Sequence, residues 1–202
     1  MLHETREAWL VAAVTQLRPV LGDAQLVPGN IRVSCGWPAR GALSPSKRRI
    51  GECWPAEQNE DGYSHVFVSP LLAEPISVVG TLLHELIHAS LPAKCKHNKR
   101  FAKAALSCGL EGKPTATSVG GKLAERINAR ILPTLGDYPH QSIDAKPKPK
   151  QGTRLRLYEC ECIPDKEQGI TNKVRVASDN WQATCGRCEV ILRRVDVKGE
   201  GG

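Results

Sequence analysis

The sequence predicts an α+β protein: a domain in which helices pack on a small antiparallel sheet, followed by a small β module built around four cysteines. Apolar residues recur with helical spacing in several segments, and short segments between them alternate apolar and polar residues as half-buried strands do. Two cysteine pairs follow a segment of alternating lysine and proline. With 202 residues, 41% hydrophobic and 24% charged, the chain can fold one substantial domain and a small module.

The first predicted element is a helix at residues 5–21, since apolar residues recur there at helical spacing. Three strands are predicted next, at residues 30–37, 50–54 and 65–69. In the first of these, Ile31, Val33 and Cys35 alternate with polar residues. A polar loop joins the last two strands, and we expect the three to form an antiparallel meander.

The next predicted helix carries the sequence His84-Glu85-Leu86-Ile87-His88. Because a helix advances about 100° per residue, His84 and His88 lie one turn apart on one side and can share a metal ion. Glu85 falls on the same flank, where it can hydrogen-bond a water on the metal as a general base. Apolar residues occupy the opposite, core-facing side: Ile76, Val79, Leu82, Leu83, Leu86 and Ile87.

Three further residues of this segment fit its helical form and its packing. Pro75 suits a first helical position, and Pro92 ends the segment. Gly80 falls on the metal side, and glycine costs a helix interior about 1 kcal/mol relative to alanine. It therefore either leaves room above the metal or lets a strand approach closely.

A catalytic zinc usually has three protein ligands and one open position, so the histidine pair needs a third ligand. His97 is the best candidate, because it follows the end of the helix and precedes an amphipathic segment at residues 98–108. Glu111 and His140 are the alternatives. The interpretation without a metal is that His84 and His88 form a pair of hydrogen-bonded core histidines.

The remainder of the first domain is predicted to pack beneath this site. Residues 120–132 form a helix with Leu123, Ile127 and Ile131 on one face, after which Pro133, Gly136 and Pro139 break the regular pattern. We expect the domain to span residues 1–140. A basic Pro/Lys linker at residues 141–153 follows, with the stiffness of alternating proline.

The C-terminal module, residues 154–202, is predicted to be a zinc ribbon with strands at 154–158, 173–177 and 190–194. Four thiolates can close a tetrahedral structural site and hold together a module too small for its own core. The second pair has the usual two-residue spacing, whereas the first is one residue tighter, so free thiols or a redox pair are the alternative. The predicted zinc ligands are Cys160, Cys162, Cys185 and Cys188.

The other four cysteines are predicted to be small buried thiols, kept reduced in a cytosolic protein. They are Cys35, Cys53, Cys95 and Cys108. Trp9, Trp37 and Trp54 are expected in the core or covering the sheet. Trp37 and Trp54, each followed by proline, could also line a cleft.

A net charge of +7 and a pI near 9.1 favour a polyanionic partner. Three basic runs contain no acidic residue, which favours nucleic acid, although solvated faces are the alternative. One run surrounds His97: Lys94, Lys96, Lys99, Arg100 and Lys103. Another fills a loop between strands: Arg40, Lys47, Arg48 and Arg49. The predicted nucleic-acid-binding residues lead into the ribbon: Lys146, Lys148, Lys150, Arg154 and Arg156.

The run HELIHASLPAKCKHNKRFAKAALSCGLEGKPTAT resembles the SprT-like metallopeptidase family, in particular its phage-encoded branch, where the third histidine follows after eight intervening residues. The segments VSCGWPARGAL, RIGECWPAEQ, HVFVSP and LGDYPH and the cysteine-bearing tail extend the resemblance over most of the chain. Asn98 stands where the family usually has glycine. Since asparagine tolerates left-handed backbone conformations, we expect that turn to survive.

The resemblance implies a zincin-like fold, in which an edge strand lies beside the metal helix. His84, His88 and His97 would be the ligands of a catalytic Zn²⁺, Glu85 the catalytic residue, and a second zinc would be structural. It also implies a zinc-dependent metalloendopeptidase whose protein substrate is associated with DNA, because the related Spartan proteases degrade proteins attached to DNA.

The alternative function is a non-catalytic, metal-stabilised nucleic-acid-binding adaptor of the transcription-elongation type. Retention of Glu85 favours the enzyme, because an inert scaffold could keep the histidines without that carboxylate. No signal peptide and no apolar stretch long enough to cross a bilayer are visible, so we expect no membrane partner. The expected location is the cytoplasm of a bacterial or phage-infected host cell.

Overall fold

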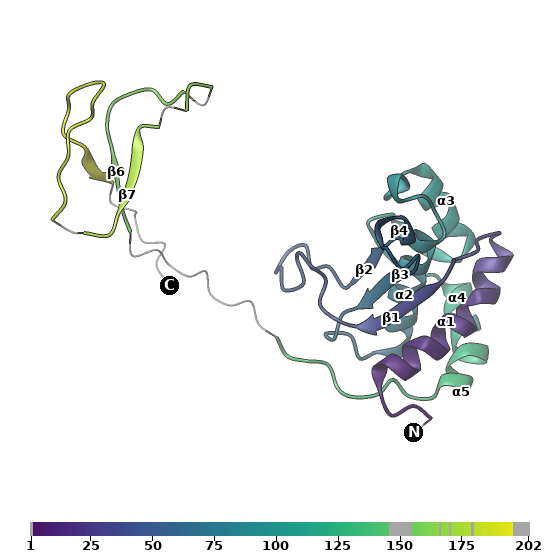
Figure 1. Ribbon diagram of the computed structural model, residues 1–202. Helices are drawn as coiled ribbons and strands as arrows, with labels where there is room; N and C mark the ends of the chain where they lie inside the picture. Colours follow the sequence, from purple (N-terminus) through teal and green to yellow (C-terminus); the bar gives the residue numbers. More distant parts are fainter. Residues whose placement is uncertain (1, 146–154, 166, 170, 179, 196–202) are drawn as a thin grey trace. The chain divides into compact units, whose positions relative to one another are not determined.

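The computed structural model describes residues 2–145, 155–165, 167–169, 171–178 and 180–195 (Figure 1). The chain divides into two compact units, Met1–Pro147 and Lys148–Gly202, at a point inside the segment 141–153 that the sequence predicts to be a linker. Most of that segment lies outside the described residues. So do Lys146, Lys148, Lys150 and Arg154, which leaves their predicted nucleic-acid contacts as predictions.

Helix α1, Arg6–Asp23, extends beyond the end that the sequence predicts. It begins at Thr5, whose side-chain oxygen accepts a hydrogen bond from the Ala8 N–H, a standard N-cap. Its inner face is fully covered: Trp9, Leu10, Leu17 and Leu21 have no exposed surface. The Trp9 indole N–H also donates to the Gly136 carbonyl at 3.0 Å, so the expectation that Trp9 belongs to the core is confirmed.

The three predicted strands exist as β1 (Ile31–Cys35), β2 (Gly51–Trp54) and β3 (Ser64–Val68), with a 3₁₀ turn η1 (Ala56–Gln58) between the last two. The predicted antiparallel meander is wrong. The strand order is β1-β3-β2, with β1 parallel to β3 and β2 antiparallel to it. β3 takes the middle because it is the most buried strand, and residues 36–50 carry the chain past it to the far edge.

Helix α2, Pro75–Ala89, packs against this sheet, beside β2 and β3 (Figure 1). Its N-cap is Glu74, whose carboxylate accepts from the N–H groups of Ile76 and Ser77 at 2.9 and 2.6 Å. The predicted apolar stripe is buried, although Ile76 is only partly covered. In combination with α1 it forms the core of the first unit.

A 3₁₀ turn η2 (Ala93–Cys95) and helix α3 (Lys99–Ser107) follow. Asn98 is the N-cap of α3, and its side-chain oxygen accepts from the N–H groups of Arg100 and Phe101. The turn survives, as expected, but for another reason: the Asn98 backbone is extended, with φ −73°, and does not adopt a left-handed conformation. Lys96 has the positive φ instead, at 42°. Asparagine is therefore suited to this position by its capping oxygen.

The sequence did not predict the hairpin of β4 (Leu110–Lys113) and β5 (Ala116–Val119). Three of the four β4 residues are exposed, so no apolar alternation marks it as a strand. The position of β5 distinguishes between the two roles expected for Gly80, which were room above the metal and close approach of a strand. A Cβ built on Gly80 would lie 2.5 Å from Val119 Cγ2, so the glycine lets β5 approach the helix closely.

The last helical segment of this unit is longer than predicted. It runs through α4 (Gly121–Arg126), a π-helical turn η3 (Ile127–Ile131) and α5 (Leu132–Leu135), and ends at Gly136 with φ 68°. Leu123, Ile127 and Ile131 are buried on one face as expected. Pro133 does not break the helix, because it lies in the first turn of α5, directly after the π-helical turn.

Arg6 is buried and fastens α1 to two loops that are distant in the sequence. Its guanidinium donates to the carbonyls of Pro139 at 3.1 Å, Pro70 at 3.0 Å and Gln141 at 2.5 Å. Its charge lies 5.2 Å from the centre of the Tyr138 ring. A guanidinium presents five N–H donors in a planar fork of fixed geometry, so it can donate to three carbonyls that lie in different directions.

Replacing Arg6 by methionine should lower the free energy of unfolding of the first unit by about 2–3 kcal/mol, because three carbonyls lose a charged donor in a buried place. Urea unfolding followed by circular dichroism measures this. Arg18→Met, on the exposed side of the same helix, is the matched control and should change stability little. Equal stability of the two variants would contradict the role of Arg6.

The second unit contains one antiparallel sheet in the order β7-β6-β8, formed by β6 (Arg156–Glu159), β7 (Lys173–Val176) and β8 (Arg193–Val195). These strands overlap the three predicted ones. Tyr158 and Cys160 are the only buried residues among those described beyond residue 154. In the described parts of both units, no helix has the length and apolar character needed to span a membrane.

Candidate metal centres

The three histidines predicted to bind a metal converge on one point. His84 and His88 lie one turn apart on α2, and the chain turns back after η2 to present His97. Nε2 of His97 lies 3.1 Å from Nε2 of His84 and 3.1 Å from Nε2 of His88. Tetrahedral zinc with bonds of about 2.0–2.1 Å separates two nitrogen ligands by about 3.3 Å, so the spacing is compatible with zinc.

Burial and neighbouring charges favour the neutral form of all three imidazoles, which is the form that binds a metal. Burial, followed by the charge of His97, lowers the pKa of His84 to about 4. The pKa of His88 is lowered to about 3, mainly by burial and to a smaller extent by the charges of His84 and His97. The pKa of His97 is lowered by burial and then by the positive charge of Arg49. Neutral rings with three lone pairs facing one another repel unless a cation lies between them.

Neighbouring side chains fix the orientation of the rings. Nδ1 of His84 lies 2.8 Å from Oγ1 of Thr117 on β5. A ring that binds a metal through Nε2 carries its proton on Nδ1, and that N–H would then donate to Thr117. The Phe101 ring of α3 stacks on His88, with centroids 4.3 Å apart and planes 24° from parallel. Sequence reasoning missed Thr117, and a single threonine in a short polar segment gives no signal of this role.

Glu85 points between α2 and the edge strand β2, and its side chain lies against Gly51. A Cβ at Gly51 would lie 2.5 Å from Glu85 Oε1 and 2.8 Å from Thr81 Cγ2, so only glycine leaves space for the carboxyl group. Glu85 is only 7% exposed. Burial, followed by the charge of Glu52, raises its pKa to about 8, against a lowering effect of Arg49. The group is therefore a strong base once it is ionised.

The two alternative ligands are not part of the histidine cluster. Glu111 is exposed on β4, and its carboxyl group lies against Gly120, where a Cβ would clash with Oε1. His140 is exposed, with φ 65°. Among the described residues, the group with metal-ligand spacing in the first unit is His84, His88 and His97.

The four cysteines of the second unit also converge. One ligand atom from each of Cys160, Cys162, Cys185 and Cys188 lies within 4.8 Å of all the others. The sulfurs of Cys162 and Cys185 are 3.7 Å apart, and a tetrahedral zinc with Zn–S bonds of about 2.3 Å requires about 3.8 Å. The tight spacing of the first pair therefore does not prevent a four-sulfur site compatible with zinc.

The backbone around Cys185 and Cys188 favours the thiolate form of Cys185. The N–H groups of Cys188 and Arg187 donate to the Cys185 sulfur and lower its pKa to about 6. A positive φ of 53° at Glu189 turns the chain, and the Glu189 N–H donates to the Cys185 carbonyl at 2.9 Å. Such a turn, with amide groups directed at a sulfur, is a knuckle that favours metal binding.

The other four cysteines are free, as predicted, and lie in the first unit. Cys95 and Cys108 are buried, whereas Cys35 and Cys53 are partly covered. Burial, followed by the charge of Glu85, raises the pKa of Cys53 to about 12. Its thiol is therefore neutral and unreactive beside the candidate base.

The described basic residues differ in their surroundings: some are exposed, and others make contacts within the protein. Lys94, Lys96, Lys99, Arg100 and Lys103 are all exposed beside His97. Arg49, on the loop before β2, is close enough to His97 and Glu85 to change the pKa of both, and it also pairs with Glu52 at 2.8 Å. Arg156 donates to the Ala177 carbonyl at 2.9 Å, so part of its guanidinium is used within the ribbon.

The chain matches no protein-family model, and no curated protein matches it in sequence. The resemblance to SprT-like metallopeptidases therefore rests on the motifs of the sequence itself.

Proposed function

We propose that this chain is a zinc-dependent endopeptidase of the SprT-like type, with a zincin-like first domain, that acts on proteins associated with nucleic acid. One observation carries the proposal: three imidazoles converge, with Nε2 of His97 3.1 Å from Nε2 of each of the other two, and the next residue after His84 is a buried carboxyl group outside the ligand set. A structural metal site has no need of such a base, whereas hydrolysis does.

The side chains have separate roles in the proposed reaction. His84, His88 and His97 hold the metal, with His84 oriented by Thr117. A bound zinc ion supplies Lewis acidity, which polarises a scissile carbonyl and lowers the pKa of a water from 15.7 to about 7. Glu85 takes the proton of the attacking water and passes it to the departing amine. Its raised pKa suits both steps near neutral pH.

The edge strand β2 supports the choice of a peptide substrate. Among the strands of the described residues, β2 pairs with β3 alone, so its other side presents main-chain donors and acceptors. An extended peptide can pair with such an edge. Because Gly51 of this strand lies against Glu85, a peptide paired there passes beside the candidate base.

The basic rim of the histidine site supports an association with nucleic acid. We define this rim as two exposed basic runs. One ends at Arg49, whose charge acts on His97, and contains Arg40, Lys47, Arg48 and Arg49; the other surrounds His97 in the sequence and contains Lys94, Lys96, Lys99, Arg100 and Lys103. Among the described residues, the only ion pair of the rim joins Arg49 and Glu52. Unpaired cations around a hydrolytic site attract a polyanion that carries the protein to be cleaved.

Metal content separates this proposal from the non-catalytic adaptor. The full-length protein should bind two zinc ions, measured by inductively coupled plasma mass spectrometry. Replacing His97 by alanine should remove one ion, and replacing Cys185 and Cys188 by serine should remove the other. Glu85→Gln is the control that should retain both. A single ion that depends only on the cysteines would favour the adaptor and overturn the proposed hydrolase.

A further inference from the structure

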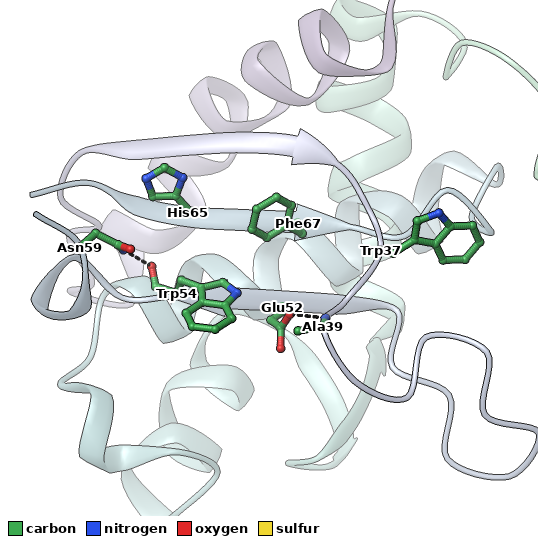
Figure 2. Close-up of a pocket in the computed structure, with 7 residues that line it drawn as sticks. All are labelled: Trp37, Ala39, Glu52, Trp54, Asn59, His65 and Phe67. Carbon is green, nitrogen blue, oxygen red and sulfur yellow. Dashed lines mark hydrogen bonds between the residues drawn. The ribbon is translucent and has the colours of Figure 1, made fainter. Parts of the chain in front are cut away.

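An open aromatic groove of about 390 Å³ lies on the outer face of the first sheet, which the mechanism above does not use (Figure 2). Its lining is Trp37, Ala39, Glu52, Trp54, Asn59, His65 and Phe67. The face follows from strand alternation. On β3, Ser64, Val66 and Val68 are buried toward the core, so His65 and Phe67 project the other way. Figure 2 shows these two rings and Trp54 along neighbouring strands.

The rings of the groove are available to a ligand. Trp37 and Trp54 are each 43% exposed. Large aromatic side chains gain most when they are buried, so two exposed tryptophans leave apolar surface free for a ligand. Within the described residues, none of the four groove rings stacks on another aromatic ring. Apart from Ala39, the lining contains no aliphatic side chain, so it is suited to flat ring systems more than to branched apolar ones.

The two ends of the groove differ in charge. The loop that leaves Trp37 and returns to β2 carries four exposed cations: Arg40, Lys47, Arg48 and Arg49. Glu52 projects into the groove, but both of its oxygens are occupied, one by Arg49 at 2.8 Å and one by the Ala39 N–H at 2.7 Å. The exposed acids Glu57, Glu60 and Asp61 follow Trp54 at the other end, where Asp61 lies 3.3 Å from His65 of the lining and also pairs with Arg32. A polyanion is therefore favoured at the Trp37 end alone.

We propose that this groove binds single-stranded nucleic acid, with unpaired bases stacked on Trp37 and Trp54 and the phosphates along the basic loop. Exposed aromatic faces beside a cationic segment are the arrangement that binds single strands without reading their sequence, since every base has a flat face. In a double strand the bases are stacked on one another, so their faces are not free to stack on the two tryptophan rings. This inference supplies the nucleic-acid surface of the proposed function and so rests on it.

Binding of a fluorescein-labelled 12-nucleotide oligothymidine to the full-length, zinc-loaded protein tests the proposal by fluorescence anisotropy. Trp54→Leu, which keeps an apolar side chain and loses the flat ring, should weaken binding about 5- to 100-fold. Trp54→Phe should retain most of it. Leu106→Ala, at an exposed apolar position on α3, is the control and should bind as wild type. Equal affinity of Trp54→Leu and Trp54→Phe would contradict stacking and favour an apolar peptide as the occupant.

Cross-linking locates the bound strand even if other basic segments contribute to affinity. An oligothymidine containing 5-iododeoxyuridine, irradiated in the complex, should cross-link to Trp37 or Trp54, as mapped by mass spectrometry. Replacing Arg40, Lys47 and Arg48 together by glutamine should reduce the salt dependence of binding, whereas Trp54→Leu should leave that dependence unchanged. Cross-links confined to other segments would overturn the proposal. Binding is measured without hydrolysis, so this result does not depend on the activity of the metal centre.

Discussion

Glu85→Gln is expected to lower the rate of peptide hydrolysis by about 10²- to 10⁴-fold, which is the usual contribution of a general acid–base residue. Glutamine has the shape of glutamate and fits the space beside Gly51, but it cannot accept a proton from water. The amide also removes the group whose pKa burial raises to about 8. The substrate should be a protein bound to single-stranded DNA, with cleavage followed by gel electrophoresis.

Two measurements make the Glu85 result specific. Glu85→Gln should keep the zinc of the histidine site, so that lost activity is not lost metal. Glu111→Gln, which changes an exposed carboxyl group outside the cluster, should cleave as wild type. Equal cleavage by wild type and Glu85→Gln would exclude Glu85 as the general base, whatever the metal content.

The histidine centre could be predicted from the sequence because helical periodicity is a local property. His84, Glu85 and His88 are fixed relative to one another by a single turn of helix, and a core-facing stripe sets its orientation. His97 needed only a chain reversal over a short segment. Thr117 could not be predicted, because its contact with His84 joins residues 33 positions apart through a hairpin with no apolar alternation.

Strand positions could be predicted in the same local way, but strand neighbours could not. Alternation shows which residues of a strand share a face, and it contains no information on the adjacent strand or its direction. The expected meander rested on the polar loop between the last two strands, whereas β3, with Val66 and Val68 buried, lies in the centre of the sheet. Arg6 shows the same limit, since a buried arginine is recognised only once the carbonyls of Pro70 and Pro139 are known to surround it.

The four-cysteine cluster should decide whether the second unit folds at all. Its described strands have three or four residues each, and only Tyr158 and Cys160 are buried among the residues described there. Tyr158 packs against Trp181, with ring centroids 4.9 Å apart. The apolar core of the described part of this unit is therefore very small. Structural zinc contributes an apparent binding free energy of about 10–16 kcal/mol at neutral pH, far more than such a core can supply.

Replacing Cys188 by serine should therefore unfold residues 155–195 and leave the first unit intact. Hydrogen exchange measured by mass spectrometry should show loss of protection in β6, β7 and β8, with α1 and α2 unchanged. Cys35→Ser, at a partly covered thiol outside the cluster, is the matched control and should leave the exchange of the second unit as in wild type. Zinc removal by a chelator should reproduce the effect of Cys188→Ser and, in addition, empty the histidine site. Protection that survives both treatments would mean that the four thiols are not the element that holds this unit together.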